Sequence, residues 1–209
     1  LKVCLKSIAK LTTYENYEII VVENNSEEQK TFDYYDEING KDKVKVEKYP
    51  EKGFNYSKII NYGVANSDGE YIIQLNNDTE LITPNWIEEM LGFAQREDVG
   101  AVGAELFYPD KSIQHAGIII GIGGVAGHVF RNIPHGMHGY FSKDAMIQNM
   151  SAVTAACMMA PRKMYEAVGN MDEKFEVAFN DVDFCLKIRE QGKLIVYNPY
   201  VQFIHYESK

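Results

Sequence analysis

The chain has 209 residues, of which 45% are hydrophobic and 12% aromatic, so it can fold around a substantial core. It carries 30 Asp and Glu residues against 21 Lys and Arg residues, a formal net charge of −9. This balance argues against a nucleic-acid groove or an anionic membrane surface as partner, since both attract clustered Lys and Arg. Any phosphate group must therefore meet a few placed side chains or a metal ion.

The first part of the chain alternates helical and strand patterns. Apolar residues at helical spacing predict a helix over 1–9, and a short β-branched run predicts a strand over 17–22. The following elements are a polar helix ending near 39, a strand over 43–47, a helix over 54–65 and a strand over 71–75. This alternation predicts an α/β domain with a mostly parallel sheet.

The later part of the chain is more mixed. Thr83 caps a helix over 84–96 that has Pro84 in its first turn. The remaining patterns predict strands over 99–107, 113–120 and 151–159, helices over 161–167 and 181–191, and strands over 194–197 and 201–205. Residues 121–144 are rich in Gly and His with little periodicity, which indicates a loop over a site.

The cysteines, Cys4, Cys157 and Cys185, are widely spaced and form no Cys-x-x-Cys pair. This pattern excludes a disulfide framework and a Cys-rich zinc site, and it suits a reducing cytoplasm. No apolar run reaches the ~18 residues of a membrane span. Because the chain opens on Leu1 rather than Met, we expect it to be a fragment of a longer protein.

Two polar clusters follow predicted strands, at the position where open α/β sheets bind ligands. They consist of Glu23, Asn24 and Asn25, and of Asn76, Asn77 and Asp78. A carboxylate such as Asp78 at this edge can hold a hard divalent cation, which in turn can bridge a diphosphate. A turn followed by a helix cap explains the same residues, and the two interpretations remain open.

A third cluster precedes the helical pattern at 181–191. Asp181 and Asp183 are either carboxylates favoured by the helix dipole or the source of a general base that faces a hydroxyl nucleophile. His205 follows a short strand and is either structural or a metal ligand. His115 and His128 flank the Gly-rich loop and fit packing residues, since neither has ligand spacing to a neighbour.

These segments, taken in order, resemble the family 2 glycosyltransferases of bacteria, which have the GT-A fold. The resemblance is carried by the segments at 17–26, 53–58 with 61–63, 68–80, 152–157, 169–173 with 180–183, and 205–208. Each motif alone is weakly specific, whereas six in order, covering nearly the whole chain, are specific. The segments at 114–117 and 177–181 are most similar to enzymes that build O-antigen and other surface polysaccharides.

The resemblance implies a Rossmann-like GT-A domain with a nucleotide-sugar-binding half at 1–83 and an acceptor-binding half at 84–209. It implies inverting transfer of a sugar from a UDP- or dTDP-sugar to a hydroxyl of a glycan or lipid-linked oligosaccharide, with no nucleic-acid partner. The implied location is the cytoplasm or the inner face of the membrane, with peripheral membrane association through parts of the protein outside this chain.

The resemblance also assigns roles to single residues. Mg²⁺ or Mn²⁺ is held by Asp78 and His205, and Asp181 is the catalytic base. The implied donor-binding residues are Glu23, Asn25, Asn55, Lys58, Asn76, Asn77 and Asp78. The implied acceptor-binding residues are Asp183, which alternatively only caps its helix, and Ala156. The loop at 121–144 is expected to close over both substrates and exclude water.

Two departures from the family pattern stand out. The first strand of the fold has no counterpart before Leu1, which would leave part of the nucleotide wall absent and the fragment inactive. The metal motif begins with Asn76 instead of Asp, so one carboxylate is lost. Two alternatives remain at this point: a sugar-phosphate nucleotidyltransferase, and a non-catalytic glycan-binding domain derived from a transferase.

Overall fold

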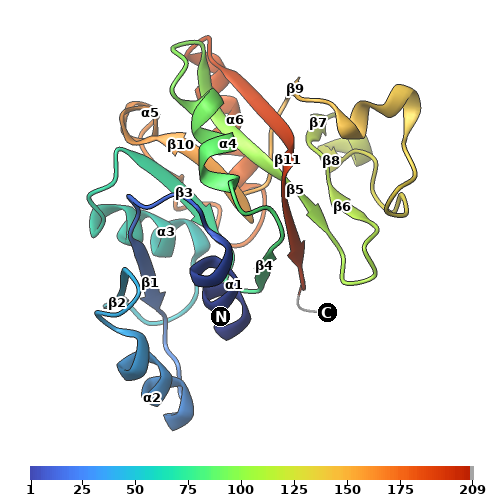
Figure 1. Ribbon diagram of the computed structural model, residues 1–209. Helices are drawn as coiled ribbons and strands as arrows, with labels where there is room; N and C mark the ends of the chain where they lie inside the picture. Colours follow the sequence, from blue (N-terminus) through green and yellow to red (C-terminus); the bar gives the residue numbers. More distant parts are fainter. Residues whose placement is uncertain (208–209) are drawn as a thin grey trace.

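The computed structural model describes residues 1–207, whose N-terminal part is a small parallel pair of strands covered by helices (Figure 1). Strands β1 (Ile19–Glu23) and β2 (Val44–Lys48) pair in parallel, with Val21 opposite Val46. The helices of this part are α1 (Lys2–Leu11), α2 (Gln29–Ile38) and α3 (Tyr56–Ala65). The predicted alternation of helix and strand is therefore confirmed here.

Within residues 1–207, the main sheet has seven strands, which run in both parallel and antiparallel directions. Its order is β3 (Tyr71–Leu75), β10 (Cys157–Pro161), β5 (Val99–Phe107), β11 (Leu194–His205) and β4 (Thr79–Leu81), with β6 (Ile113–His115) on β5 and β9 (Gln148–Met150) on β11. The central pair, β5 and β11, is parallel, and the other pairings in this sheet are antiparallel. Strands from both halves of the chain thus share one sheet.

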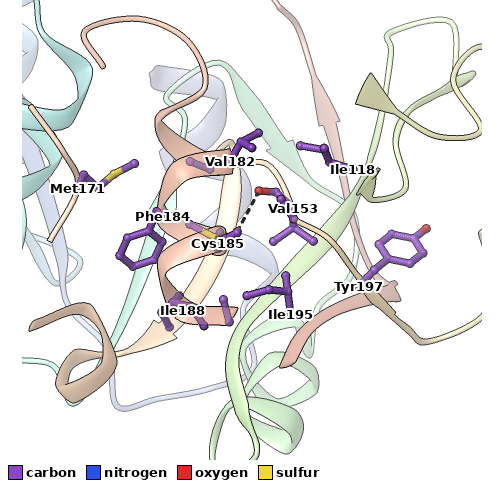
Figure 2. Close-up of a cluster of buried hydrophobic side chains, with 14 of the residues drawn as sticks. Ile118, Val153, Met171, Val182, Phe184, Cys185, Ile188, Ile195 and Tyr197 are labelled. Carbon is purple, nitrogen blue, oxygen red and sulfur yellow. Dashed lines mark hydrogen bonds between the residues drawn. The ribbon is translucent and has the colours of Figure 1, made fainter. Parts of the chain in front are cut away.

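The core lies on both faces of β5, all of whose residues are buried. Met90 of helix α4 (Trp86–Ala94) shares one apolar cluster with Val102, and Ile188 of helix α6 (Asn180–Glu190) shares a second cluster with Ala101. Figure 2 shows the layer under α6, in which the Cys185 Sγ lies 3.8 Å from a backbone carbonyl oxygen. The alternation of side chains along β5 thus produces two apolar layers.

Helices α1 and α3 cover opposite faces of β1. Val21 packs with Leu5 of α1, while a Cβ on Gly63 of α3 would lie 3.1 Å from the side chain of Val22. Among residues 1–207, β1 pairs only with β2, and β3 pairs only with β10. Each of the two sheets therefore ends in a strand whose outer edge is unpaired.

Some predicted strand boundaries were wrong. The expected strand over 151–159 begins only at Cys157, because the amides of residues 154–156 bind side chains instead of a neighbouring strand. The expected strand over 113–120 is divided at Gly117, which has a φ of 103°. The two strands expected over 194–197 and 201–205 are one strand, β11, with an irregular register after Asn198.

Residues 118–147 form a lobe beside the sheet (Figure 1). The lobe contains β7 (Ile118–Ile120), β8 (Ala126–His128) and two 3₁₀ turns, η1 (Ile122–Gly124) and η2 (Tyr140–Ala145). The expected loop at 121–144 is thus partly ordered as a hairpin. Helix α5 spans Arg162–Ala167. All three cysteines are free and buried, and within residues 1–207 no helix has the length and apolar character to cross a bilayer.

Candidate active site

Asp78 and His205 meet at one edge of the main sheet. Asp78 lies in the turn between β3 and β4, and His205 ends β11, whose register sets it opposite Thr79. The Nε2 atom of His205 lies 3.1 Å from Oδ1 of Asp78. This contact holds the pKa of Asp78 below its usual value, although partial burial opposes the shift. The pairing of β4 with β11 therefore brings together two predicted metal ligands.

Gln114 fixes the orientation of the His205 ring. The Oε1 atom of Gln114 lies 2.7 Å from Nδ1 of His205, and an amide oxygen only accepts, so Nδ1 carries a proton. The Nε2 atom of His205 then faces Asp78 with either a second proton or a lone pair. Two acceptor atoms 3.1 Å apart repel unless a proton or a cation lies between them.

The Asp78–His205 pair has the donor atoms of an incomplete divalent-cation site. One carboxylate and one imidazole nitrogen are both suitable ligands, and Gln114 supplies the outer hydrogen bond that metal-binding histidines commonly make. Within the described part of the chain, no group of three or more His, Cys, Asp or Glu residues could hold a metal ion. A cation held here would therefore take its other ligands from water or from a bound molecule, as is usual for Mg²⁺.

Tyr56 joins this pair to a second acidic site. Its hydroxyl donates to the Ala155 carbonyl at 3.3 Å and lies 3.5 Å from Oδ1 of Asn76. Burial raises the pKa of Tyr56, and the negative charges of Asp181 and Asp78 raise it further. The Tyr56 hydroxyl therefore keeps its proton and lies within the electrostatic reach of both carboxylates.

Asp181 stands in the first turn of α6 and is held by two backbone amides. Its Oδ1 accepts from Val182 at 2.8 Å, and its Oδ2 accepts from Ala155 at 3.3 Å. The helix begins abruptly because Phe179 adopts a left-handed conformation with a φ of 62°. The carboxylate is half-buried, and its charge raises the pKa of Tyr56, so the two side chains lie within electrostatic reach of each other.

The predicted donor-binding residues at the end of β1 form a separate group. Glu23 is buried and accepts from the Ser26 amide at 2.6 Å. Asn25 donates to the Gly53 carbonyl at 3.2 Å, and Lys58 pairs with Glu51 at 2.9 Å. These contacts tie the end of β1 to the loop that leads into α3.

Asn55 caps the N-terminus of α3. Its side chain accepts from the amide of Lys58 at 3.0 Å and donates to the carbonyl of Glu173 at 2.8 Å. Among residues 1–207, no hydrogen bond or ion pair joins Glu23, Asn25 or Lys58 directly to Asp78. The structure thus arranges the predicted donor residues in two clusters.

The remaining predicted residues have varied surroundings. Asn77 is exposed, whereas Ala156 is buried and its carbonyl accepts from the Asn76 amide at 3.0 Å. Asp183 pairs with Lys187 at 2.8 Å one turn along α6. Its assignment to the acceptor stays a prediction. Ser208, the last residue of the closing motif at 205–208, lies outside the described residues.

Tyr56 and Gln114 were not among the predicted site residues. Both stood inside segments that carried the resemblance, at 53–58 and 114–117. Their importance depends on partners far along the chain: Tyr56 contacts the Ala155 carbonyl, and Gln114 contacts His205. Residue type alone gives no signal for either contact.

Comparison with known families gives a direct match. A sequence model described as "Glycosyl transferase family 2" matches residues 1–169. Asp181 and His205 lie beyond the matched range, so their inclusion in the site depends on the contacts described above.

Two curated relatives match the whole chain. An uncharacterised protein, y4gI, of Sinorhizobium fredii (strain NBRC 101917 / NGR234) is 44% identical over 209 residues. The O-antigen biosynthesis protein RfbC of Myxococcus xanthus is 35% identical over the same length. The chain spans only 23% and 16% of these two proteins.

Solved structures share the fold. The structure of GalNAc-T7 with UDP, GalNAc and Mn²⁺ has a TM-score of 0.76 at 15% identity and covers 97% of this chain and 40% of its own. The mannosyltransferase PcManGT of Pyrobaculum calidifontis, in complex with GDP-Man and Mn²⁺, has a TM-score of 0.67 at 12% identity, with 95% and 50% covered. At these identities the likeness establishes the fold alone.

Proposed function

This chain belongs to glycosyl transferase family 2, and we propose that it transfers a sugar from a nucleotide diphospho-sugar to a glycan hydroxyl group with inversion at the anomeric carbon. The observation that carries this proposal is the arrangement of two acidic groups about Tyr56: Asp78 pairs with His205 beside Asn76, and Asp181 binds the amide of Ala155, the residue whose carbonyl accepts from the Tyr56 hydroxyl. Such a transfer requires a group that neutralises the charge of the leaving diphosphate and a base that accepts a proton. A cation-binding pair can supply the first function, and a separate carboxylate can supply the second.

Asp181 is the proposed general base. It accepts the proton of the acceptor hydroxyl while that oxygen forms a bond to the anomeric carbon. The bond between the anomeric carbon and the diphosphate oxygen breaks at the same time, and the nucleoside diphosphate leaves with that electron pair. The amides of Val182 and Ala155 hold the carboxylate in place for the transfer. A positioned base of this kind contributes about 10²–10⁴-fold to the rate.

Asp78 and His205 are the proposed holders of Mg²⁺ or Mn²⁺. The ion, when bound, neutralises negative charge on the diphosphate. Gln114 keeps the His205 ring turned so that Nε2 faces Asp78. The complexes of GalNAc-T7 and PcManGT with Mn²⁺ support this assignment, since both have the same fold. Asn76 lies beside His205 at 3.3 Å and occupies the place where the family pattern has a further carboxylate.

The donor nucleotide is proposed to bind between the two clusters of predicted residues. Glu23 and Asn25 would contact the base or ribose, Asn76 and Asn77 the ribose, and Lys58, at the start of α3 capped by Asn55, a phosphate. UDP and GDP-Man in the two structural neighbours support a nucleotide-linked donor. Ala156 and Asp183 are proposed to border the acceptor.

The wider role proposed is the synthesis of a cell-surface polysaccharide. The match to the O-antigen biosynthesis protein RfbC of Myxococcus xanthus supports it. Because this chain spans only 16% of RfbC, the activity and acceptor of the longer protein remain proposals of their own. The cytoplasmic location and the membrane association expected from the sequence also stay predictions.

The test is a transfer assay with a panel of UDP- and dTDP-sugars, Mn²⁺ and a mixed set of glycan acceptors. Release of the nucleoside diphosphate with a glycosylated product supports the proposal, whereas release of pyrophosphate from a nucleoside triphosphate would identify a nucleotidyltransferase. Asp181→Asn should lower transfer by about 10²-fold or more while nucleotide-sugar binding is retained. Glu190→Gln is the control, because it also replaces a carboxylate by the matching amide, at the exposed end of α6. Parent-like turnover by Asp181→Asn would exclude the proposed base.

A further inference from the structure

A hollow of about 430 Å³ lies between the lobe at 118–147 and strand β9. Its walls come from three segments: the hairpin of β7 and β8 with the residues that follow it, the turn η2, and β9 with the residue after it. These segments lie at the side of the main sheet from which the lobe projects (Figure 1). Asp78, Asp181 and His205 are not among the lining residues, so the hollow is separate from the candidate active site. Its size is that of a pocket for a small molecule.

Hydrogen bonds tie the walls of the hollow to the main sheet and to each other. Strand β9 pairs with β11, and the hydroxyl of Tyr197 in β11 donates to the carbonyl of Asp144 in η2 at 2.8 Å. The Asp144 carboxylate accepts from the Gly139 amide at 2.8 Å, and the Gln148 side chain donates to the Lys143 carbonyl. The hollow is therefore shaped by the fold itself, which lowers the cost of ordering it around a ligand.

Apolar and aromatic side chains form much of the lining. Ile119, Phe130 and Met150 belong to it, and so does Tyr140, whose side chain is 73% exposed. The Tyr140 ring meets the ring of Phe141 edge to face, with centroids 4.5 Å apart, so it is braced without being covered. The electron-rich face of an aromatic ring attracts weakly positive C–H groups, such as those on one face of a pyranose.

Polar groups of the lining lack partners within the protein. Four lining side chains make no hydrogen bond or ion pair with another residue in 1–207: Tyr140, Lys143, Asn149 and Ser151. Together they offer hydroxyl, ammonium and amide groups, which can donate to and accept from the oxygen atoms of a sugar. An acyl chain in the hollow would take these groups out of water without replacing their hydrogen bonds. The lining therefore suits a ligand that combines an apolar face with several hydroxyl groups.

The hollow adjoins the segment that holds Asp181. Ser151 lines the hollow, and Ala155, four residues further on, donates its amide to Oδ2 of Asp181 at 3.3 Å. Because an extended chain spans at most about 3.3–3.6 Å per residue, the Cα atoms of residues 151 and 155 are no more than about 14 Å apart. A bridge between Ile118 and Ala152 fixes this segment to the lobe. A glycan whose end reaches Asp181 can therefore place another of its units in the hollow.

We propose that the hollow is a remote acceptor subsite, which binds one pyranose unit of the glycan other than the unit whose hydroxyl group reacts at Asp181. The Tyr140 ring lies against the C–H face of that pyranose, and Lys143 and Asn149 bind its oxygen atoms. The inference rests on the proposed function in so far as it assigns this sugar to the acceptor. It gives the lobe, which the sequence indicated as a loop over a site, a role in selecting acceptors longer than one sugar.

The first test is a binding measurement that needs no turnover. The probes are the methyl glycosides of glucose, galactose, mannose, rhamnose, N-acetylglucosamine and glucuronic acid, each added alone to nitrogen-15-labelled protein. At least one glycoside should shift the backbone amide resonances of residues 143, 149 and 151 in a saturable manner. Unshifted resonances with all six glycosides would overturn the proposal. A shift with UMP and with none of the glycosides would place a nucleotide in the hollow and overturn it as well.

Variants of Tyr140 test the aromatic contact. Tyr140→Ala should abolish the shifts, whereas Tyr140→Phe, which keeps the ring, should retain them. Tyr200→Ala is the matched control, because Tyr200 is also exposed, at 58%, and lies on β11 outside the hollow. This control should respond to the glycosides as the parent does. Equal responses of Tyr140→Ala and Tyr200→Ala would exclude the contact.

Kinetic constants distinguish a remote subsite from a general distortion of the site. Tyr140→Ala should raise the KM for an acceptor of several sugar units about tenfold and leave kcat and the donor KM unchanged, because the lost contact is the same in the ground state and the transition state. The KM for a monosaccharide acceptor, which reaches only the position at Asp181, should equal that of the parent. An equal rise for acceptors of both lengths would contradict the assignment.

Two further outcomes separate the subsite from the proposed function. A protein that binds glycosides in the hollow yet transfers no sugar would contradict the proposed function and leave the sugar site standing. A transferase in which Tyr140→Ala keeps the parent KM for long acceptors would contradict the subsite and leave the proposed function standing.

Discussion

The Nε2 atom of His205 lies 3.1 Å from Oδ1 of Asp78, although one residue ends the last strand of the chain and the other follows β3. Antiparallel pairing of β4 with β11 sets this distance, because the register aligns His205 with Thr79. The contact therefore depends on a complete sheet, and the candidate cation site forms only when both ends of the domain are folded together.

Removal of the Asp78 carboxylate should abolish metal-dependent nucleotide binding. In the parent, UDP or dTDP with Mn²⁺ should raise the thermal unfolding midpoint by mass action, and EDTA should cancel the rise. Asp78→Ala should show no rise that depends on Mn²⁺. The matched control is Asp98→Ala, which removes an exposed partner of Arg96. An equal, chelator-sensitive rise in Asp78→Ala would exclude the metal role.

Loss of the Gln114 amide should weaken metal binding, although neither metal ligand is removed. Because Gln114 orients the His205 ring through a 2.7 Å hydrogen bond, Gln114→Leu should lower Mn²⁺ affinity by about 10–100-fold. Titration of Mn²⁺ against a fixed nucleotide concentration measures this affinity. Gln29→Leu, on the exposed surface of α2, should bind as the parent does. Equal affinities for both variants would show that the ring needs no such support.

Ionisation of Glu105 should make the folded protein less stable as the pH rises. Burial raises the pKa of Glu105 to about 7, from an ordinary value of 4.5, so the folded state favours the protonated carboxyl. The stabilisation is complete below about pH 4.5 and is lost as the pH rises to about 7. Glu105→Gln keeps an acceptor for Gln202, which donates at 2.8 Å, and removes the charge.

Denaturant unfolding across this pH range should show the difference. At pH values above the raised pKa, Glu105→Gln should be more stable than the parent by up to about 3 kcal/mol, since a tenfold change in a proton dissociation constant corresponds to about 1.4 kcal/mol. At pH values below about 4.5 the two proteins should differ little. A constant stability difference at all pH values would contradict the titration of Glu105.

Substitution of Gly103 should disrupt the layer under α6. A Cβ at this position would lie 2.4 Å from the Cβ of Val153, a distance that requires the backbone to move. Gly103→Ala should therefore cost about 1–3 kcal/mol of unfolding free energy. Gly92→Ala, in α4 with no atom near the new Cβ, should instead stabilise the protein by up to about 1 kcal/mol. Equal effects of the two changes would refute a packing role for Gly103.

The sequence was sufficient to predict the elements whose patterns are strong. The apolar run over 99–107 became β5 with the predicted bounds, and the helix predicted over 181–191 is α6, from Asn180 to Glu190. The segment at 151–156 was misread because its small, buried residues resemble a strand. Its amides are satisfied by His115, Asp181 and Thr154, which only the tertiary structure reveals.

The same limit applies to the site. Asp78, Asp181 and His205 could be selected because carboxylates and imidazoles at strand and helix ends are chemically conspicuous. Gln114 and Tyr56 are common residue types whose roles arise from contacts across 91 and 99 positions of chain. A local sequence pattern contains no information about contacts between residues so far apart in the chain, so these two site residues were not predicted.

The unpaired outer edges of β1 and β3 bear on how the molecule associates. Each edge presents a row of N–H and C=O groups without a strand beside it among residues 1–207. Such rows act as templates for an added strand, whether from another part of the same protein or from a neighbouring molecule. Helices α1 and α3, on opposite faces of β1, would flank a strand that entered there. A strand added at either edge would extend that sheet and occupy its free N–H and C=O groups.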